Sequence, residues 1–281
     1  MTCNVTCDTI ERVLTPRTRA LMVVHIAGQP CDMDPILALA RAHGLKVIED
    51  AAHALPARYR GRWAGTLGDA GAFSFYATKN ITTGEGGLLV TSDPEALEAA
   101  RVLALHGISK DAWKRYSAAG NWYYEVLASG YKYNLSDIHA SLGVHQLRKL
   151  DAFYATRRRY VDRYQRGLHD LDAISLPSEA PGTQHAWHLY MVRLRPEVLG
   201  IDRKAFIEEL RARNIGTSVH FIPLHLHPYY QETWGYRPGD FPFAETAYGH
   251  TLSLPLYPGM SEGDVDDVIQ AVWDVARRNR R

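Results

Sequence analysis

Short, nearly continuous apolar runs alternate with helix-like patterns through the first half of the chain. Four strands are predicted, over residues 20–26, 46–50, 70–76 and 87–90, and the first of them is expected to be buried on both faces. Two helices are predicted between and after these runs, over residues 35–43 and 95–105. The alternation of strand and helix is typical of a parallel α/β sheet.

The pattern changes in the second half of the chain. A long helix, straight or kinked, is predicted from Ser136 as its N-cap to about Leu168, and residues 157–159 on it are expected to form a solvated or salt-bridged arginine face. The polar segment 175–183 follows and contains Pro and Gly, which is typical of a domain boundary. We therefore predict a large α/β domain over residues 1–175 and a smaller α+β domain over residues 176–281.

The smaller domain is expected to mix strands and helices. Its predicted strands cover residues 186–194, 216–222 and 252–256. Its predicted helices cover residues 203–213 and 243–250, and a last helix runs from its N-cap Ser261 to about residue 278.

Two charged residues stand at the ends of predicted strands in the large domain. Lys79 lies in a loop of Thr, Asn and Gly between the third and fourth strands, and Asp50 ends the second strand. In open α/β sheets ligands bind outside the carboxyl ends of the strands. Lysine suits Schiff-base chemistry, and a buried carboxylate needs a cationic partner such as a pyridinium N–H. Alone, each has a simpler explanation, as a surface lysine or a turn aspartate, but the pair indicates a pyridoxal phosphate site.

Three segments carry a more specific signal. Residues 48–54 are Ile-Glu-Asp-Ala-Ala-His-Ala, residues 73–87 are Phe-Ser-Phe-Tyr-Ala-Thr-Lys-Asn-Ile-Thr-Thr-Gly-Glu-Gly-Gly, and residues 130–138 are Gly-Tyr-Lys-Tyr-Asn-Leu-Ser-Asp-Ile. They resemble the DegT/DnrJ/EryC1/StrS family of sugar aminotransferases, from about Thr9 to the last helix. Within that family the chain looks most like the enzymes that aminate a 4-keto pentose on UDP, the UDP-4-amino-4-deoxy-L-arabinose type.

The resemblance implies pyridoxal phosphate as cofactor, fold type I, and roles for five residues. Lys79 would carry the cofactor and shuttle a proton, and Asp50 would keep the ring nitrogen protonated. His53 matches a ring-contacting position, with a packed core histidine as the alternative. Ser74 would bind the cofactor phosphate. Asn134 matches a residue that reaches the phosphate of the neighbouring subunit's cofactor, which implies a homodimer.

The resemblance also implies the substrates. An amino acid, expected to be glutamate, would donate its amino group to a nucleotide-linked ketosugar for polysaccharide, lipid A or related sugar synthesis. His220 and His225 match a substrate-side segment, and Lys132 is a candidate for the substrate phosphate. A metal site formed by His220, His225 and His227 is the alternative, but strand alternation and the intervening proline disfavour it, so no metal is expected.

Composition narrows the remaining classes. The 281 residues are 46% hydrophobic and 22% charged with a formal net charge of +1, which argues against nucleic acid or a membrane as the main partner. No apolar run is long enough to cross a bilayer, and the start does not resemble a signal peptide. Three cysteines fit a reducing compartment, so the protein is expected in the cytoplasm.

One departure from the family concerns the start of the chain. Family members carry an N-terminal portion, with a helix start that grips the cofactor phosphate, before the segment that resembles residues 9–20. That portion is expected to be missing here. The alternative function is therefore a truncated, non-catalytic paralogue, or a partner subunit of a complete aminotransferase that lends Asn134 to it.

Overall fold

The computed structural model describes residues 2–109 and 124–281. These residues form two compact units. The N-terminal unit takes the described residues within 5–25 and 30–150, and the C-terminal unit takes those within 1–4, 26–29 and 151–281. No helix in these ranges is long and apolar enough to cross a membrane.

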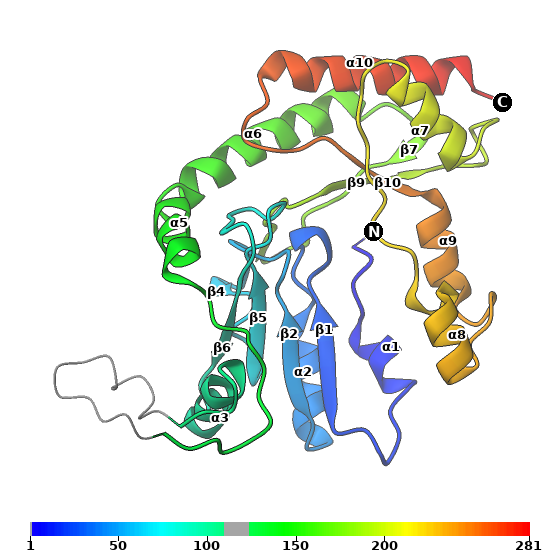
Figure 1. The fold of residues 1–281 in the computed structure, drawn as a ribbon. Helices are drawn as coiled ribbons and strands as arrows, with labels where there is room; N and C mark the ends of the chain where they lie inside the picture. The colour runs from blue at the N-terminus through cyan, green and yellow to red at the C-terminus, as the bar shows by residue number, and fades with distance from the viewer. Residues whose placement is uncertain (1, 110–123) are drawn as a thin grey trace. The chain divides into compact units, whose positions relative to one another are not determined.

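The N-terminal unit is built on a four-stranded sheet with the order β1-β2-β5-β6 (Figure 1). Its strands are β1 (Ala20–Val24), β2 (Lys46–Asp50), β5 (Ala70–Ser74) and β6 (Gly87–Thr91). β1, β2 and β5 are parallel, and β6 is antiparallel to β5. The predicted α/β class is confirmed, and the carboxyl ends of β1, β2 and β5 share one edge of the sheet.

One face of this sheet is covered by α2 (Met33–Ala42). Leu21, Val23 and Val47 are buried on that face, together with Met33 and Ile36 of the helix. Alternate residues of β1 point the other way, where Met22 is 67% exposed. The prediction that this strand is buried on both faces is therefore wrong, because among the described residues only the face toward α2 is covered.

The remaining elements of the unit follow the sequence pattern. Its other helices are α1 (Cys7–Glu11), α3 (Pro94–Ala104) and α5 (Asp137–Leu147), and β3 (Arg58–Tyr59) pairs with β4 (Arg62–Trp63) in a hairpin. Ser136 caps α5 as predicted, since its Oγ accepts the backbone N–H of His139 at 3.3 Å. The predicted long helix is divided, because α5 ends at Leu147 and α6 begins at Leu150.

The C-terminal unit packs helices against a three-stranded antiparallel sheet with the order β10-β9-β7. The sheet consists of β7 (Ile174–Ser175), β9 (Tyr190–Leu194) and β10 (Thr251–Leu254), and the short strand β8 (Thr183–Gln184) lies outside it. Its helices are α6 (Leu150–Leu168, after its first residue), α7 (Arg203–Arg211), α8 (Pro228–Trp234), α9 (Pro242–His250) and α10 (Glu262–Arg278), with the 3₁₀ turns η1 (Ile26–Gly28) and η2 (Leu224–Leu226). A capping box between Ser261 and Asp264 starts α10.

Packing divides the chain earlier than the boundary expected near residue 175. Tyr160, Tyr164 and Leu168 of α6 are buried in the same core as Trp187 and Phe206. The helix therefore belongs to the C-terminal unit, although the polar segment after it suggested the boundary. Sequence composition marks the exposed segment, whereas buried side chains decide which unit a helix joins.

Two further predictions for this unit are corrected. Residues 216–222 form no strand, and of them Ser218 alone pairs, in an isolated bridge with Ser253. Arg157 is 4% exposed and not part of a solvated face. Its neighbours do form ion pairs as expected, a partly buried one between Arg158 and Glu179 and an exposed one between Arg159 and Glu262.

Candidate active site

Asp50 occupies the carboxyl end of the central strand β2. Its backbone lies between Val24 of β1 and Ala72 of β5, so two parallel neighbours fix it. Its Oδ1 accepts the backbone N–H of Ala52 at 3.0 Å, which holds the half-buried carboxylate over the turn that follows the strand. The structure thus places Asp50 at the sheet edge where ligands bind in open α/β folds.

Lys79 lies in the connection from β5 to β6. Its backbone N–H donates to the carbonyl of Tyr76 at 3.0 Å, and its side chain is half-buried. Within the described residues its Nζ has no hydrogen bond or ion pair. Burial lowers the pKa of Lys79 below its usual value, while the nearby charge of Asp50 acts in the opposite direction. An amine with this pKa shift is more nucleophilic at neutral pH than a solvated lysine.

Hydrogen bonds from both sides hold the Lys79 loop. The carbonyl of Phe75 accepts from the backbone N–H of Thr83 at 2.9 Å and from the hydroxyl of Thr82 at 3.1 Å. On the other side of Lys79, the buried Asn80 donates from Nδ2 to the carbonyl of Leu55 at 2.7 Å. These contacts make the loop a fixed support for the lysine and not a mobile surface turn.

His53 and Ser74 lie in the same unit as Lys79 and Asp50. His53 is half-buried in the turn that follows Asp50. Ser74 ends β5, and its Oγ accepts the backbone N–H of Tyr76 at 3.3 Å. Strands β2 and β5 are paired, so Asp50 and Ser74 leave the sheet from neighbouring strands.

Lys132 and Asn134 are exposed and contact one another, because Lys132 Nζ donates to Asn134 Oδ1. The flanking rings of Tyr131 and Tyr133 stack with centroids 4.8 Å apart. Alternation of side chains along this extended segment therefore puts two aromatic rings on one side and the two polar residues on the other.

His220 and His225 belong to the C-terminal unit. His220 Nδ1 and Ser253 Oγ are 3.0 Å apart, which joins the histidine to β10. His225 is buried, and its Nε2 lies 2.9 Å from Glu245 Oε1, a contact that ties η2 to α9. That pairing keeps the pKa of Glu245 below its usual value, with a contribution from the backbone N–H of Gly239. No group of three His, Cys, Asp or Glu side chains within residues 2–109 and 124–281 could hold a metal ion.

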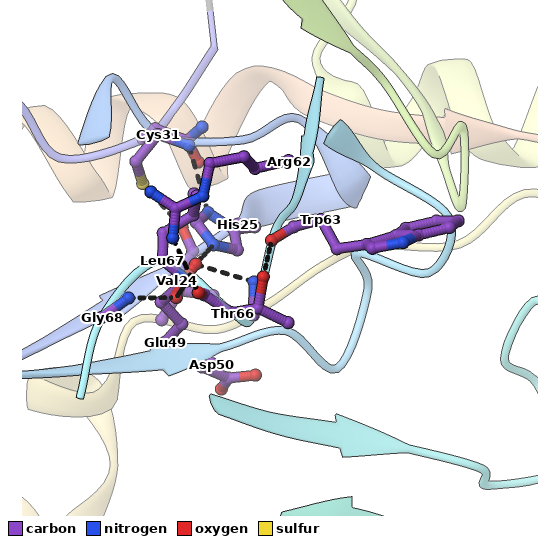
Figure 2. A network of polar contacts seen from close by, with 12 residues as sticks. Val24, His25, Cys31, Glu49, Asp50, Arg62, Trp63, Thr66, Leu67 and Gly68 are labelled. Carbon is purple, nitrogen blue, oxygen red and sulfur yellow. Dashed lines mark hydrogen bonds and ion pairs between the residues drawn. The ribbon is translucent and has the colours of Figure 1, made fainter. Parts of the chain in front are cut away.

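Sequence reasoning missed a buried polar network beside Asp50 (Figure 2). Glu49 is fully buried, and its carboxylate accepts from His25 and from three backbone N–H groups. The available signal was the period of two in β2, which places Glu49 on the same buried face as Val47. A carboxylate on that face must have hydrogen-bond donors around it.

A mostly parallel α/β sheet with a half-buried lysine and an aspartate at one edge is typical of pyridoxal-phosphate-dependent transferases of fold type I. The profile of the DegT/DnrJ/EryC1/StrS aminotransferase family matches residues 1–273, and the chain belongs to that family. The spore coat polysaccharide biosynthesis protein SpsC of Bacillus subtilis (strain 168) is 52% identical over 277 residues, which are 98% of this chain and 71% of that protein.

Solved structures agree with this assignment. The aminotransferase TlmJ of Streptoalloteichus hindustanus has a TM-score of 0.87 and 37% identity, over 99% of this chain and 71% of that one. The PLP form of Spr1654 from Streptococcus pneumoniae has a TM-score of 0.88 and 29% identity, over 98% and 72%. The predictions of fold type I, of pyridoxal phosphate as cofactor and of a sugar aminotransferase are confirmed.

The comparisons leave two finer predictions without support. The family match covers residues 1–273, and the expectation that the family's N-terminal portion is missing stays without support. The relatives described above also do not distinguish the UDP-4-amino-4-deoxy-L-arabinose type from other sugar aminotransferases.

Proposed function

We propose that the chain transfers an amino group from glutamate to a nucleotide-linked ketosugar. The observation that carries this proposal is the half-buried Lys79, whose amine is influenced by the charge of Asp50 at the edge of the sheet. The described residues around this amine fit pyridoxal phosphate, because Lys79 Nζ is unpaired among them and an acid lies within electrostatic reach. Bound there, the cofactor supplies an electron sink for the carbon that loses its proton.

Each predicted residue has a role that its position supports. Lys79 would hold the cofactor through its amine and would move the proton at the reacting carbon. Asp50 would accept a hydrogen bond from the protonated ring nitrogen, and His53, in the turn after it, would contact the ring. Ser74, at the end of the neighbouring strand, donates its hydroxyl to the cofactor phosphate.

Three residues are proposed for the substrate, each considered within its own unit. Lys132 is proposed to bind a substrate phosphate, since its ammonium is exposed. His220 is proposed to contact the sugar. For His225 the proposal is narrower, because Glu245 already engages its Nε2 and a positioning role is more consistent with that contact.

A homodimer is part of the proposal. Asn134 is exposed, and the adjoining helix α5 presents Ile138 (77% exposed), Leu142 (50%) and Leu147 (57%). Exposed apolar side chains in this number on one helix are typical of a protein interface. We propose that helix α5 pairs with a second copy, so that Asn134 of each chain reaches the cofactor phosphate of the other.

The first test is the absorbance of the purified chain with added pyridoxal phosphate. Wild type and the control Lys149→Ala, an exposed lysine of the same unit, are expected to give a band near the visible edge that changes when glutamate is added. Lys79→Ala is expected to lack the band. A wild-type spectrum equal to that of Lys79→Ala would contradict the proposal and favour a non-catalytic paralogue.

The second test addresses the sugar and the dimer. Amination is measured with two kinds of UDP-linked 4-keto sugar, one a pentose and the other not. A preference for the pentose would separate the UDP-pentose enzymes from others in the family.

Mixing inactive Lys79→Ala with inactive Asn134→Ala is expected to restore about a quarter of wild-type activity, since half of random dimers have one intact site of two. No recovery in a mixture shown to exchange subunits would contradict the shared site.

A further inference from the structure

The network around Glu49 uses every hydrogen-bonding direction of a buried carboxylate. Oε1 accepts the backbone N–H groups of Leu67 at 2.6 Å and Gly68 at 2.7 Å. Oε2 accepts the backbone N–H of Gly65 at 2.7 Å and lies 2.9 Å from His25 Nε2. Both side chains of the Glu49–His25 pair are 0% exposed. One carboxylate therefore holds three amides of a loop and the end of β1.

Geometry fixes the proton on His25. Its Nδ1 accepts the backbone N–H of Cys31 at 3.1 Å, so the ring proton is on Nε2, which donates to Glu49. Hydrogen bonds from His25 and the three backbone amides therefore surround the carboxylate of Glu49. Burial by itself would raise the pKa of Glu49, but the bonds from His25, Gly68 and Gly65 hold it below its usual value.

The amides that Glu49 holds lie directly against β5. A Cβ on Gly71 of β5 would come 1.9 Å from the carbonyl oxygen of Gly65, so the loop and the strand are in backbone contact at this point. Gly71 pairs with Glu49, and the next residue, Ala72, pairs with Asp50. Moving the loop therefore moves the segment of β5 that flanks Asp50 and ends in Ser74.

The carboxylate of Asp50 lies outside this network (Figure 2), although Asp50 follows Glu49 directly and its backbone carbonyl accepts the backbone N–H of His25 at 3.1 Å. Successive side chains of a strand point to opposite faces, so Glu49 is turned to the buried face and Asp50 to the other. We propose that Glu49, with His25, is a positioning residue that sets Asp50 and Ser74 for the cofactor without contacting it. This inference rests on the proposed roles of Asp50 and Ser74.

The test compares Glu49→Gln with Glu95→Gln, the same change at an exposed position of α3. Glutamine keeps the shape of Glu49, but its side-chain amide N–H groups would face backbone N–H groups that now donate to the carboxylate. At least one of those hydrogen bonds would therefore be lost. Two quantities are measured by titration, with Asp50→Asn as the reference variant. They are the dissociation constant of pyridoxal phosphate and the pH at which the absorbance of the bound cofactor is half-way through its change. Glu49→Gln is expected to weaken cofactor binding about tenfold. Its pH midpoint is expected to move in the same direction as in Asp50→Asn, and Glu95→Gln is expected to match wild type.

A readout without cofactor completes the test. Hydrogen exchange of the Gly65, Leu67 and Gly68 amides is expected to be faster in Glu49→Gln than in Glu95→Gln, which reports the network itself. Faster exchange with unchanged cofactor affinity and pH midpoint would show a merely structural role and overturn the inference. A wild-type chain without a Lys79-dependent band would instead overturn the proposed function, and this inference with it.

A second pair of variants decides the matter if Glu49→Gln does not fold. His25→Leu removes one donor to Glu49, whereas His25→Gln keeps an N–H donor at the end of the side chain. We expect His25→Leu to weaken cofactor binding about threefold and His25→Gln to recover most of that loss. Equal affinities in His25→Leu and wild type would contradict the inference.

Discussion

Among the described residues, the N-terminal unit buries the charged side chain of Glu49 and the C-terminal unit that of Arg157, and main-chain groups of opposite polarity surround the two. In the N-terminal unit Glu49 is 0% exposed and accepts three backbone N–H bonds and one from His25. In the C-terminal unit Arg157 is 4% exposed and donates from one guanidinium nitrogen to the carbonyls of Trp187, His188 and Leu256, at 3.1, 3.3 and 2.8 Å. No described residue forms an ion pair with Arg157.

The two sites differ in what surrounds the charge. Glu49 gathers the N–H groups of an irregular loop beside β5, next to the proposed catalytic Asp50. Arg157 joins α6 to the segment before β9 and to the residue two places after β10. Its Nε is buried and has no partner among the described residues. Main-chain N–H groups can thus surround a buried negative charge, and main-chain carbonyls a buried positive one. Of these two side chains, Glu49 has hydrogen bonds to both charged atoms, whereas Arg157 has a buried Nε without one.

The largest expected effect is that of Glu49→Ala. Four donors would lose their acceptor in a site where the Glu49 and His25 side chains are 0% exposed, and each unsatisfied buried N–H is costly. We expect the free energy of unfolding of the N-terminal unit to fall by about 4 kcal/mol. Urea unfolding read by hydrogen exchange of β2 amides measures this. A loss no larger than that of Glu95→Gln would mean that the carboxylate stabilises nothing.

The second effect tests the other half of the comparison. Arg157→Met leaves three carbonyls without this donor but removes a buried charge whose pKa burial has lowered to about 10. Carbonyl groups tolerate a missing partner better than N–H groups. We therefore expect a loss of about 2 kcal/mol in the C-terminal unit, smaller than for Glu49→Ala. The matched control is Arg159→Met, an exposed arginine of the same helix, and a larger loss there would contradict the explanation.

The third prediction concerns acid. The folded-state pKa of Glu49 is lowered, so its contribution is present above its ordinary pKa and is lost as pH falls through the folded value. Arg157 stays protonated throughout that range. Measured from neutral pH downward, the stability of the N-terminal unit is expected to fall less steeply in Glu49→Gln than in wild type. Parallel curves for the two proteins would mean that Glu49 does not titrate with unfolding.

The smallest effect is expected from an exposed ion pair. Arg280 and Asp172 are 2.7 Å apart and about half exposed. Water and salt screen such pairs, so Asp172→Asn is expected to change the melting temperature by less than about 1 °C. A melting temperature that falls clearly in low salt but not in high salt would contradict this expectation. It would show that an exposed ion pair stabilises the C-terminal unit substantially.

Prediction from sequence was most accurate where one local signal governs the element. The strand over residues 46–50 and the caps at Ser136 and Ser261 are found as expected, because alternation and capping are local properties. The strand expected over 216–222 is not formed, since pairing needs a neighbour and only Ser218 finds one. Local pattern also could not separate Arg157 from Arg159, because their burial depends on what packs against α6.

The sequence by itself determined the class of the protein. The Asp50 and Lys79 segments, with their spacing between predicted strands, indicate pyridoxal phosphate chemistry, because residue type and strand order are enough to place both at one sheet edge. Only the tertiary structure decided that Glu49 and His25 form a buried network. Its donors come from Gly65, Leu67 and Gly68, and such contacts between distant residues leave no periodic signal in the chain.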